Sequence, residues 1–404
     1  MNIRPILSAL RRHKTAASLI VLQIALSCAI ICNALFLIGG RIERMDRPTG
    51  LADEELVRVR ATSIGPNENR DAQAKVDLDA LRAIPGVKAA AITNQIPFDG
   101  SSWNTSVGTK PDQPSPTLSA GVYFGTEDLL ETYGVKLVAG RDFLPGEYLD
   151  FSAIETSSDF SVPAVIITRE MAEAMFPGEN PIGKRIHDSW GNTPVPVVGV
   201  VERMVRANDS GPTNFGYSMI LPIRPAGGRY LLRTEPSRRD EVLKAAVAAL
   251  ERTKRSRIIL DQDTLTDIAS QYYRQDKAMV WLLASVCAAL LVVTALGIVG
   301  LASFWVQQRT KQIGVRRALG ATRAQVLHYF QTENFLLTTI GIVLGMLGAF
   351  GLNQLLMSHY ELPRLPLPYL PVGALVLWLL GQVAVFGPAR RAAAVPPAIA
   401  TRSV

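Results

Sequence analysis

Four long stretches of the chain contain no Asp, Glu, Lys or Arg, and they constrain the fold more than any other feature of the sequence. Each is at least as long as the roughly 20 apolar residues that an α-helix needs to cross a bilayer. The pattern predicts a membrane protein with four transmembrane α-helices. We place them at residues 15–40, 278–306, 334–357 and 370–389, the last beginning near Pro371 because three prolines interrupt the start of its stretch.

The charges beside these stretches predict the orientation of the chain. The segments at residues 1–14, 307–333 and 390–404 together carry twelve Lys and Arg, and Glu333 is their only acid. Short cytoplasmic segments have this basic excess, so both termini are expected in the cytoplasm. The polar block at residues 41–277 and the short loop at 358–369 then lie outside. Since the block holds more acids than bases, the net charge of +7 reflects membrane topology and predicts no nucleic-acid partner.

The N-terminus has features of a membrane anchor. Residues 1–14 are expected to form a cytoplasmic interfacial helix, with apolar residues toward the lipid and basic residues toward its phosphates. The first apolar stretch is longer than the apolar region of a typical signal peptide. We therefore interpret it as an uncleaved first span, with a cleavable signal peptide as the alternative.

The polar block contains two segments that share a strand–helix–strand pattern. The first covers residues 54–94 and the second covers residues 229–263. Two such units favour a small split βαβ sheet with helices on one face, spanning about residues 50–95 and 226–263. Residues of about 96–225 would then be an inserted subdomain. Residues 264–277 are expected to form a stalk helix that enters the second span, either as a rigid coupling element or as an ordinary linker.

Motifs for catalysis or cofactor binding are weak. Residues 178–185 have the spacing of a phosphate-binding loop, but Arg185 occupies the position where the motif needs Ser or Thr for Mg²⁺. All three cysteines lie in apolar stretches, and the four histidines are scattered. We expect a non-enzymatic chain with no metal or cofactor of its own.

Two features of the membrane part suggest contacts. The segment at residues 309–327 carries five basic residues and no acid, so a soluble cytoplasmic partner could bind it. The third span carries Gly341, Gly345 and Gly348 on one helical face, where small residues allow close helix packing. That face would pack within one four-helix unit or against a second subunit. Because no charged residue lies at the centre of any predicted span, the driving energy is expected to come from another protein.

Several blocks in order resemble MacB/FtsX-like permeases of ABC transporters, the type VII or mechanotransmission group. The segment RTKQIGVRRALGATRAQV at residues 309–326 is similar to the family signature R-x-x-E-I-G-I-R-R-A-L-G-A-T. The tail at residues 388–402 is similar to the family ending P-A-R-R-A-A-R-L-D-P-L-E-A-L-R. Residues 133–143, 176–186 and 196–201 resemble recurrent blocks of its outer domain.

The resemblance implies a permease subunit in the bacterial inner membrane, with a large α+β periplasmic domain whose βαβ pair is porter-like. Separate ABC ATPase subunits would hold ATP and Mg²⁺, and a second permease, identical or not, would complete the pair. An adaptor and an outer-membrane channel are further partners in some members. The ATPase-coupling residues would be Arg309, Gln312, Gly314, Arg316, Arg317, Gly320 and Arg323.

The implied function is export or extrusion of a drug, peptide or lipid-like substrate. The alternatives are an FtsX-like force transmitter that regulates an envelope enzyme or signalling, and lipoprotein release. The chain departs from the family pattern at Gln312, where Glu is usual, and at Ala394, Pro396 and Ile399 in the tail. The loss of these charges would either alter the contact with the ATPase or mark one half of an asymmetric pair, in which the other permease keeps the usual residues.

Overall fold

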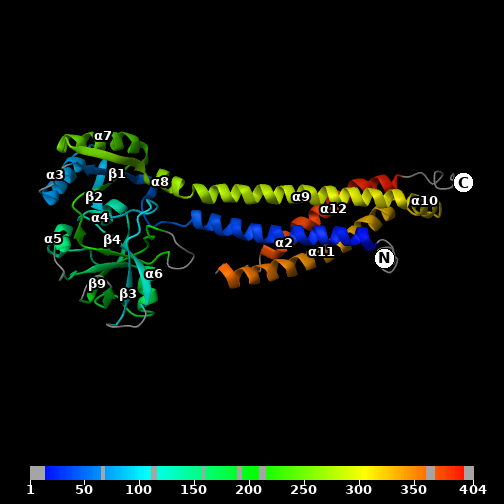
Figure 1. Cartoon of the computed structure of the whole chain (residues 1–404), viewed down its shortest axis with the longest axis horizontal. Coiled ribbons are helices and arrows are strands. Elements are labelled where there is room, and N and C mark those ends of the chain that lie inside the picture. Colours follow the sequence, from blue (N-terminus) through cyan, green and yellow to red (C-terminus); the bar gives the residue numbers. More distant parts are fainter. Residues whose placement is uncertain are drawn as a thin grey trace. The chain divides into compact units, whose positions relative to one another are not determined.

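The computed structural model describes residues 14–64, 69–110, 116–156, 160–188, 193–208, 215–360 and 369–394. The described part divides into two compact units. The membrane unit comprises Met1–Asp46 and Gln275–Val404, and the polar unit comprises Arg47–Arg274 (Figure 1). Residues 1–13 of the expected interfacial helix, most of the 358–369 loop, Pro396 and Ile399 lie outside the described residues.

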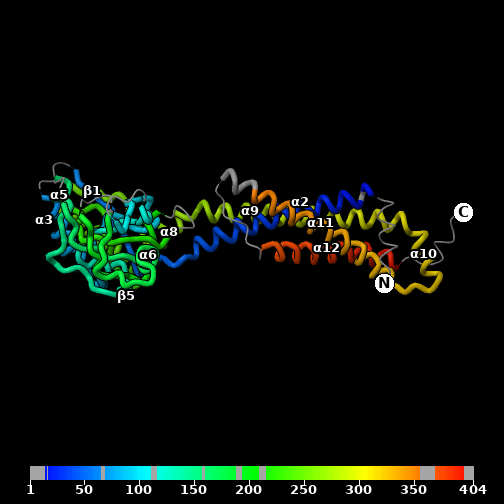
Figure 2. Tube along the Cα trace, turned by 90° about the horizontal axis from the view of Figure 1, so that it is seen from below, coloured from blue at the N-terminus to red at the C-terminus, as the bar shows by residue number. Residues whose placement is uncertain are grey.

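Among its described residues, the membrane unit contains four helices that are long and apolar enough to cross a membrane. They are α2 (Lys14–Met45), α9 (Arg274–Gln308), α11 (Arg323–Tyr360) and α12 (Tyr369–Ala393). Helix α2 packs mainly against α11 and α12, and the three run close together in the Cα trace (Figure 2). With the α+β fold of the polar unit, these helices confirm the predicted fold class.

Two helix boundaries differ from those predicted. Helix α11 starts at Arg323, well before the apolar stretch that begins at residue 334, because its first turns pack in a small core of their own. The expected stalk helix at residues 264–277 is two helices. Helix α8 (Leu265–Tyr272) ends at Tyr273, whose backbone leaves the helical conformation at φ −85° and ψ 9°, and α9 begins at Arg274.

The two strand–helix–strand segments of the polar unit form one antiparallel sheet of order β13-β1-β12-β2. Its strands are β1 (Leu56–Ser63), β2 (Val87–Thr93), β12 (Arg229–Thr234) and β13 (Arg257–Thr264). The apolar faces of α3 (Arg70–Arg82) and α7 (Arg239–Thr253) contribute to its core. Strand β12 lies between β1 and β2, which is the split βαβ arrangement.

The segment between these halves forms a second, mixed sheet of order β5-β9-β7-β10-β4-β3-β8. Strand β8 also pairs with β9, so the strand pairing closes into a ring. The strands are β3 (Asn104–Gly108), β4 (Leu118–Phe124), β5 (Leu137–Gly140), β7 (Val165–Thr168), β8 (Arg185–Asp188), β9 (Val195–Val201) and β10 (Ser218–Leu221). This inserted subdomain has a separate apolar core, to which α6 (Arg169–Met175) contributes.

Short elements complete the polar unit. They are η1 (Asp53–Glu55), α4 (Leu129–Tyr133), η2 (Pro145–Glu147), α5 (Phe151–Thr156) and η3 (Pro236–Arg238), with the paired strands β6 (Leu149–Asp150) and β11 (Ile223–Arg224). Residues 178–184 of the phosphate-loop-like sequence lie between α6 and β8, where Gly178 and Gly183 have positive φ, and Arg185 begins β8.

Candidate functional site

A short helix between the second and third membrane-length helices is the centre of the candidate site. Helix α10 (Thr310–Ala318) has one buried side, formed by Ile313 and Gly314. Ile313 packs with Val326 and Phe330 of α11 and with alanines at the end of α12. This small core holds α10 against the ends of two longer helices.

The chain leaves α10 through a well-defined turn. Gly320 has φ +97°, a conformation that side chains other than glycine rarely adopt. The amide of Ala321 donates to the carbonyl of Arg316, and the amide of Gly320 donates to that of Arg317, both at 3.1 Å. These bonds form a Schellman motif. Thr322 and Gln325 then exchange side-chain and backbone hydrogen bonds at the start of α11. Gly320 therefore shapes the site without presenting a side chain.

Arg309 lies inside the membrane unit and not on its surface. Its Nη1 contacts both carboxylate oxygens of Glu333 at 3.0 and 3.1 Å, and both residues are buried. A direct docking contact by Arg309 does not fit this burial. The pair instead ties the start of α10 to α11, since removing either partner would leave a buried charge uncompensated.

The two arginines in the last turn of α10 differ. Arg317 is partly buried and donates from Nη1 to the carbonyl of Ala393 at 3.0 Å. That carbonyl lies at the C-terminus of α12, where a cation is favoured by the helix dipole. Arg316 is exposed and lies over the ring of Tyr329, with Cζ 5.2 Å from its centroid. Of the two, Arg316 therefore remains accessible to a partner.

The exposed side of α10 and the following turn combines basic, polar and apolar groups. Leu319 is 83% exposed and Val315 is 50% exposed. The exposed polar members of this surface are Lys311, Gln312, Arg316 and Arg323. We call these six residues the α10 face. Large apolar side chains beside cations on an exposed helix are typical of a surface that another protein covers.

The glycines predicted on the third span face α2. A Cβ atom at Gly341 would lie 2.8 Å from Cβ of Ile24, and one at Gly345 would lie 2.5 Å from Cβ of Cys28. At Gly348 the nearest atom, Cβ of Ala29, is 3.9 Å away. The first two glycines therefore serve packing within the membrane unit, and Gly348 is less constrained.

Polar contacts that the sequence did not reveal join α2 and α9. The Nε2 of Gln23 donates to the carbonyl of Val293 at 3.0 Å, and Ser27 and Thr294 share a hydrogen bond of 2.8 Å. Near the other end, the buried carboxylate of Asp276 pairs with Arg41 and Arg44. No sequence pattern indicated that these two arginines and this acid meet.

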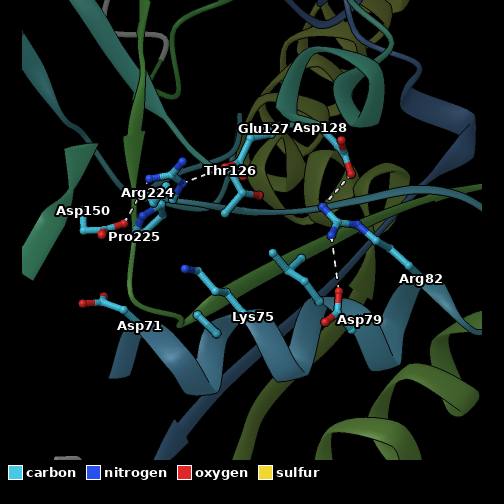
Figure 3. Close-up of a pocket in the computed structure, with 12 residues that line it drawn as sticks. Asp71, Lys75, Asp79, Arg82, Thr126, Glu127, Asp128, Asp150, Arg224 and Pro225 are labelled. Carbon is cyan, nitrogen blue, oxygen red and sulfur yellow. Dashed lines mark hydrogen bonds and ion pairs between the residues drawn. The ribbon is translucent and has the colours of Figure 1, made fainter. Parts of the chain in front are cut away.

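A cleft of about 530 Å³ separates α3 from the inserted subdomain (Figure 3). Arg82 of α3 reaches across it to Asp128 with an Nη2–Oδ2 distance of 2.6 Å. Arg224 pairs with Glu127 at 2.7 Å and with Asp150 at 3.3 Å. Because these cations already have anionic neighbours, the cleft is a polar seam between subdomains. Among the described residues, no group of three or more His, Cys, Asp or Glu could hold a metal ion.

Comparison with known proteins identifies relatives of both units. A family model described as MacB-like periplasmic core domain matches residues 18–252, and one described as FtsX-like permease C-terminal matches residues 284–397. The macrolide export ATP-binding/permease protein MacB of Agrobacterium fabrum is 26% identical, over 86% of this chain and 54% of its own length. The chain thus spans about half of that relative.

Two further relatives are a permease of similar length and a solved extracellular domain. The ABC transporter permease YvrN of Bacillus subtilis is 22% identical over 99% of both chains. The extracellular domain of YknZ, a noncanonic ABC-type transporter from Gram-positive bacteria, is 15% identical with a TM-score of 0.30. That match covers 50% of this chain and 100% of the solved domain.

Proposed function

The chain belongs to the MacB/FtsX-like family of ABC-transporter permeases, and we propose that it transmits the motion of a separate ATPase to its polar unit in order to export a substrate. The α10 face is the observation that carries this proposal. A mobile linker would not need a helix fixed by its own core, a buried ion pair and a Schellman turn. A rigid helix with an apolar tip can transmit a push from a bound partner.

The partner that fits the α10 face has an acidic rim around an apolar groove. Leu319 and Val315 would enter the groove, while Lys311, Arg316 and Arg323 would meet the acids. In the proposed arrangement this partner is an ABC ATPase that holds ATP and Mg²⁺. Gln312 lies on the same face, so replacing the usual Glu with a neutral side chain would change the charge at the contact with the ATPase.

The proposed location is the bacterial inner membrane, with both termini and α10 in the cytoplasm and the polar unit in the periplasm. The basic excess beside the spans supports this orientation. A second permease, the same chain or an unlike one, would complete the assembly, and an adaptor and outer-membrane channel would extend its path. The export substrate would be a drug, peptide or lipid-like molecule.

Two other roles use the same coupling. An FtsX-like transmitter would move the polar unit in order to regulate an envelope enzyme or signalling, without transport. Lipoprotein release is the third role. The large polar unit, with two subdomains and two cores, favours export because a transmitter needs less structure outside the membrane.

Co-purification tests the contact. We expect the full chain, purified gently from its native membrane, to bring an ABC ATPase that mass spectrometry identifies. The double variant Leu319→Asp/Arg316→Glu should retain at least tenfold less ATPase. It places one acid where Leu319 would enter the apolar groove of the partner and another where Arg316 would meet the partner's acids. A tenfold loss corresponds to about 1.4 kcal/mol of binding free energy.

The matched control is Arg390→Glu, which reverses an exposed charge near the end of α12 that is not one of the six residues of the α10 face. It should retain the ATPase at the parent level. Equal capture by the double variant and the parent would contradict docking through α10. Loss of ATPase in Arg390→Glu as well would show that general charge, and not the α10 face, controls binding.

A further inference from the structure

A loop of the polar unit is buried although it has no regular secondary structure. Residues 203–208 follow β9, and we call them the relay loop. Met204 and Val205 are fully buried, and Ala207 is 2% exposed. Loops usually run over the surface, because buried backbone polar groups need partners. Other segments of the chain supply those partners here.

The segment that follows α2 covers one side of the relay loop. The carbonyl of Thr49 accepts a hydrogen bond of 3.0 Å from the amide of Val205. Gly50, with φ +85°, lies so close that a Cβ atom there would be 2.2 Å from the carbonyl oxygen of Arg203. The hydroxyl of Thr49 donates to both carboxylate oxygens of Asp53. The exit from the first span is therefore held against the loop by backbone contacts.

The segment that leads into α9 contacts the same loop. Tyr272 donates from its hydroxyl to Oδ1 of Asn208 at 3.2 Å. The ring of Phe98 lies 5.4 Å from that of Tyr272 and 5.3 Å from that of Tyr273, centroid to centroid. The amide of Phe98 donates to the carbonyl of Ala207 at 3.0 Å. The entry to the second span thus reaches the loop directly and through Phe98.

Phe98 holds an unusual backbone conformation at this junction. Its φ is +71°, and within the described ranges it is the single non-glycine residue with positive φ. Such a conformation costs free energy and persists where the surroundings impose it. The aromatic cluster and the bond to Ala207 impose it here.

The relay loop is also tied to the seven-stranded sheet. Tyr123 of β4 donates from its buried hydroxyl to the carbonyl of Val205 at 2.8 Å. Arg206 donates from Nη2 to Oδ1 of Asn104, on β3, at 2.8 Å. A displacement of the loop would therefore displace two adjacent strands of the inserted subdomain.

We propose that the relay loop carries the motion of the first and second spans into the inserted subdomain. The chain segments beside both spans meet it, and the loop is bonded to the sheet beyond. Phe98, Gly50 and Tyr273 are positioning residues of this joint, because they act through the loop and touch no substrate. The inference rests on the proposed function, in which an ATPase moves those spans.

The test uses two spin labels in the full chain, reconstituted in lipid nanodiscs. The polar unit has no cysteine and the three natural ones are buried. Arg274→Cys, at the start of α9 and inside the polar unit, and Glu173→Cys on α6 are therefore selectively labelled. Pulsed electron resonance should give one narrow distance distribution in the parent. Phe98→Ala should broaden it at least twofold, because the joint loses its aromatic packing.

The matched control is Phe151→Ala, which removes a phenylalanine that stacks on Phe124 in the same unit, away from the relay loop. Its distribution should stay narrow. In the complex with the ATPase, ATP and vanadate should leave the parent distance unchanged and shift it in Phe98→Ala, because there the spans move without the sheet.

Equal distributions in Phe98→Ala and the parent would overturn the relay. So would a nucleotide-dependent distance in the parent, because the joint would then be a hinge. If Phe98→Ala fails to fold, Gly50→Val is the second variant. Its side chain would clash with the carbonyl of Arg203 in the relay loop, so the distance distribution should broaden in the same way. If the chain does not co-purify with an ATPase, the proposed function is contradicted but the relay loop is not. The width of the distance distribution is measured without an ATPase and tests the loop separately.

Discussion

At the scale of single residues, the partners of each charged group decide its role. Arg309 and Arg316 belong to one basic segment, yet Arg309 pairs with buried Glu333 and Arg316 stays exposed. In the polar unit, Glu55 lies between Arg233 and Lys88, and hydrogen bonds from these two cations lower the pKa of its carboxyl. Such a pair stabilises the folded state only while the acid is ionised.

The lowered pKa of Glu55 makes a pH prediction. Its contribution to folding is fully present above pH 4.5, its ordinary value, and is lost as the pH falls through the lowered pKa. Glu55→Gln should therefore reduce the Tm of the full chain at pH 7 and have a smaller effect at the lowest pH that the fold tolerates. Differential scanning fluorimetry across this range measures both.

The control for this prediction is Glu251→Gln, which changes an exposed acid on α7. Its Tm should follow that of the parent at every pH. If Glu55→Gln shifts the Tm equally at all pH values, the loss comes from packing and not from the ionised carboxylate.

At the scale of elements, α11 packs closely on α2 at some of its glycines and not at others. A Cβ atom at Gly345 would meet both Cβ of Cys28 and the carbonyl oxygen of Ala25, the latter at 2.6 Å. Gly351 lies on the same helix, and a Cβ atom there would have nothing within 4 Å. The two glycines share a helix but differ in their surroundings, so they form a matched pair.

We expect Gly345→Ala to destabilise the membrane unit by roughly 1–3 kcal/mol, as overpacking of a close contact does. Gly351→Ala should be neutral or should stabilise by up to about 1 kcal/mol through helix propensity. Gly348→Ala should be tolerated as well. Thermal unfolding of the three variants in one detergent gives the comparison, and equal Tm values would show that α2 and α11 do not pack through Gly345.

At the scale of the whole molecule, side chains that clamp backbone link the two subdomains of the polar unit. Asn94 donates to the carbonyl of Val122 and accepts from the amide of Phe124, both at 2.9 Å, and Gln95 also donates to Val122 at 2.8 Å. Asn94 and Gln95 directly follow β2, and their side-chain amides bond to the backbone of β4. Ion pairs such as Arg82–Asp128 add to the connection.

These links predict that residues 47–274, expressed alone, fold without the membrane helices. The unit has two apolar cores and needs no disulfide. It should unfold in one cooperative transition, which circular dichroism and calorimetry can follow. Two separate transitions would contradict the clamp at Asn94 and Gln95, and loss of near-ultraviolet signal in the isolated unit would contradict independent folding.

The sequence by itself determined the features that arise from local composition. Charge-free stretches predicted the four membrane-length helices, since a bilayer excludes unpaired charge over a fixed thickness. Alternating and helical periodicities located the two strand–helix–strand segments of one sheet. The charge pattern placed a basic segment between the second and third spans, although it did not show that α11 begins at Arg323.

Only the tertiary structure decided which residues meet. Burial of Arg309 requires Glu333 to come beside it when α11 packs near α10. The glycine face of α11 packs against α2, which lies about 300 residues earlier in the chain. The stalk breaks at Tyr273 beside Phe98, and the segments next to two different spans converge on one loop. Periodicity describes how one element divides between water and core, whereas these contacts depend on several distant elements packing at once.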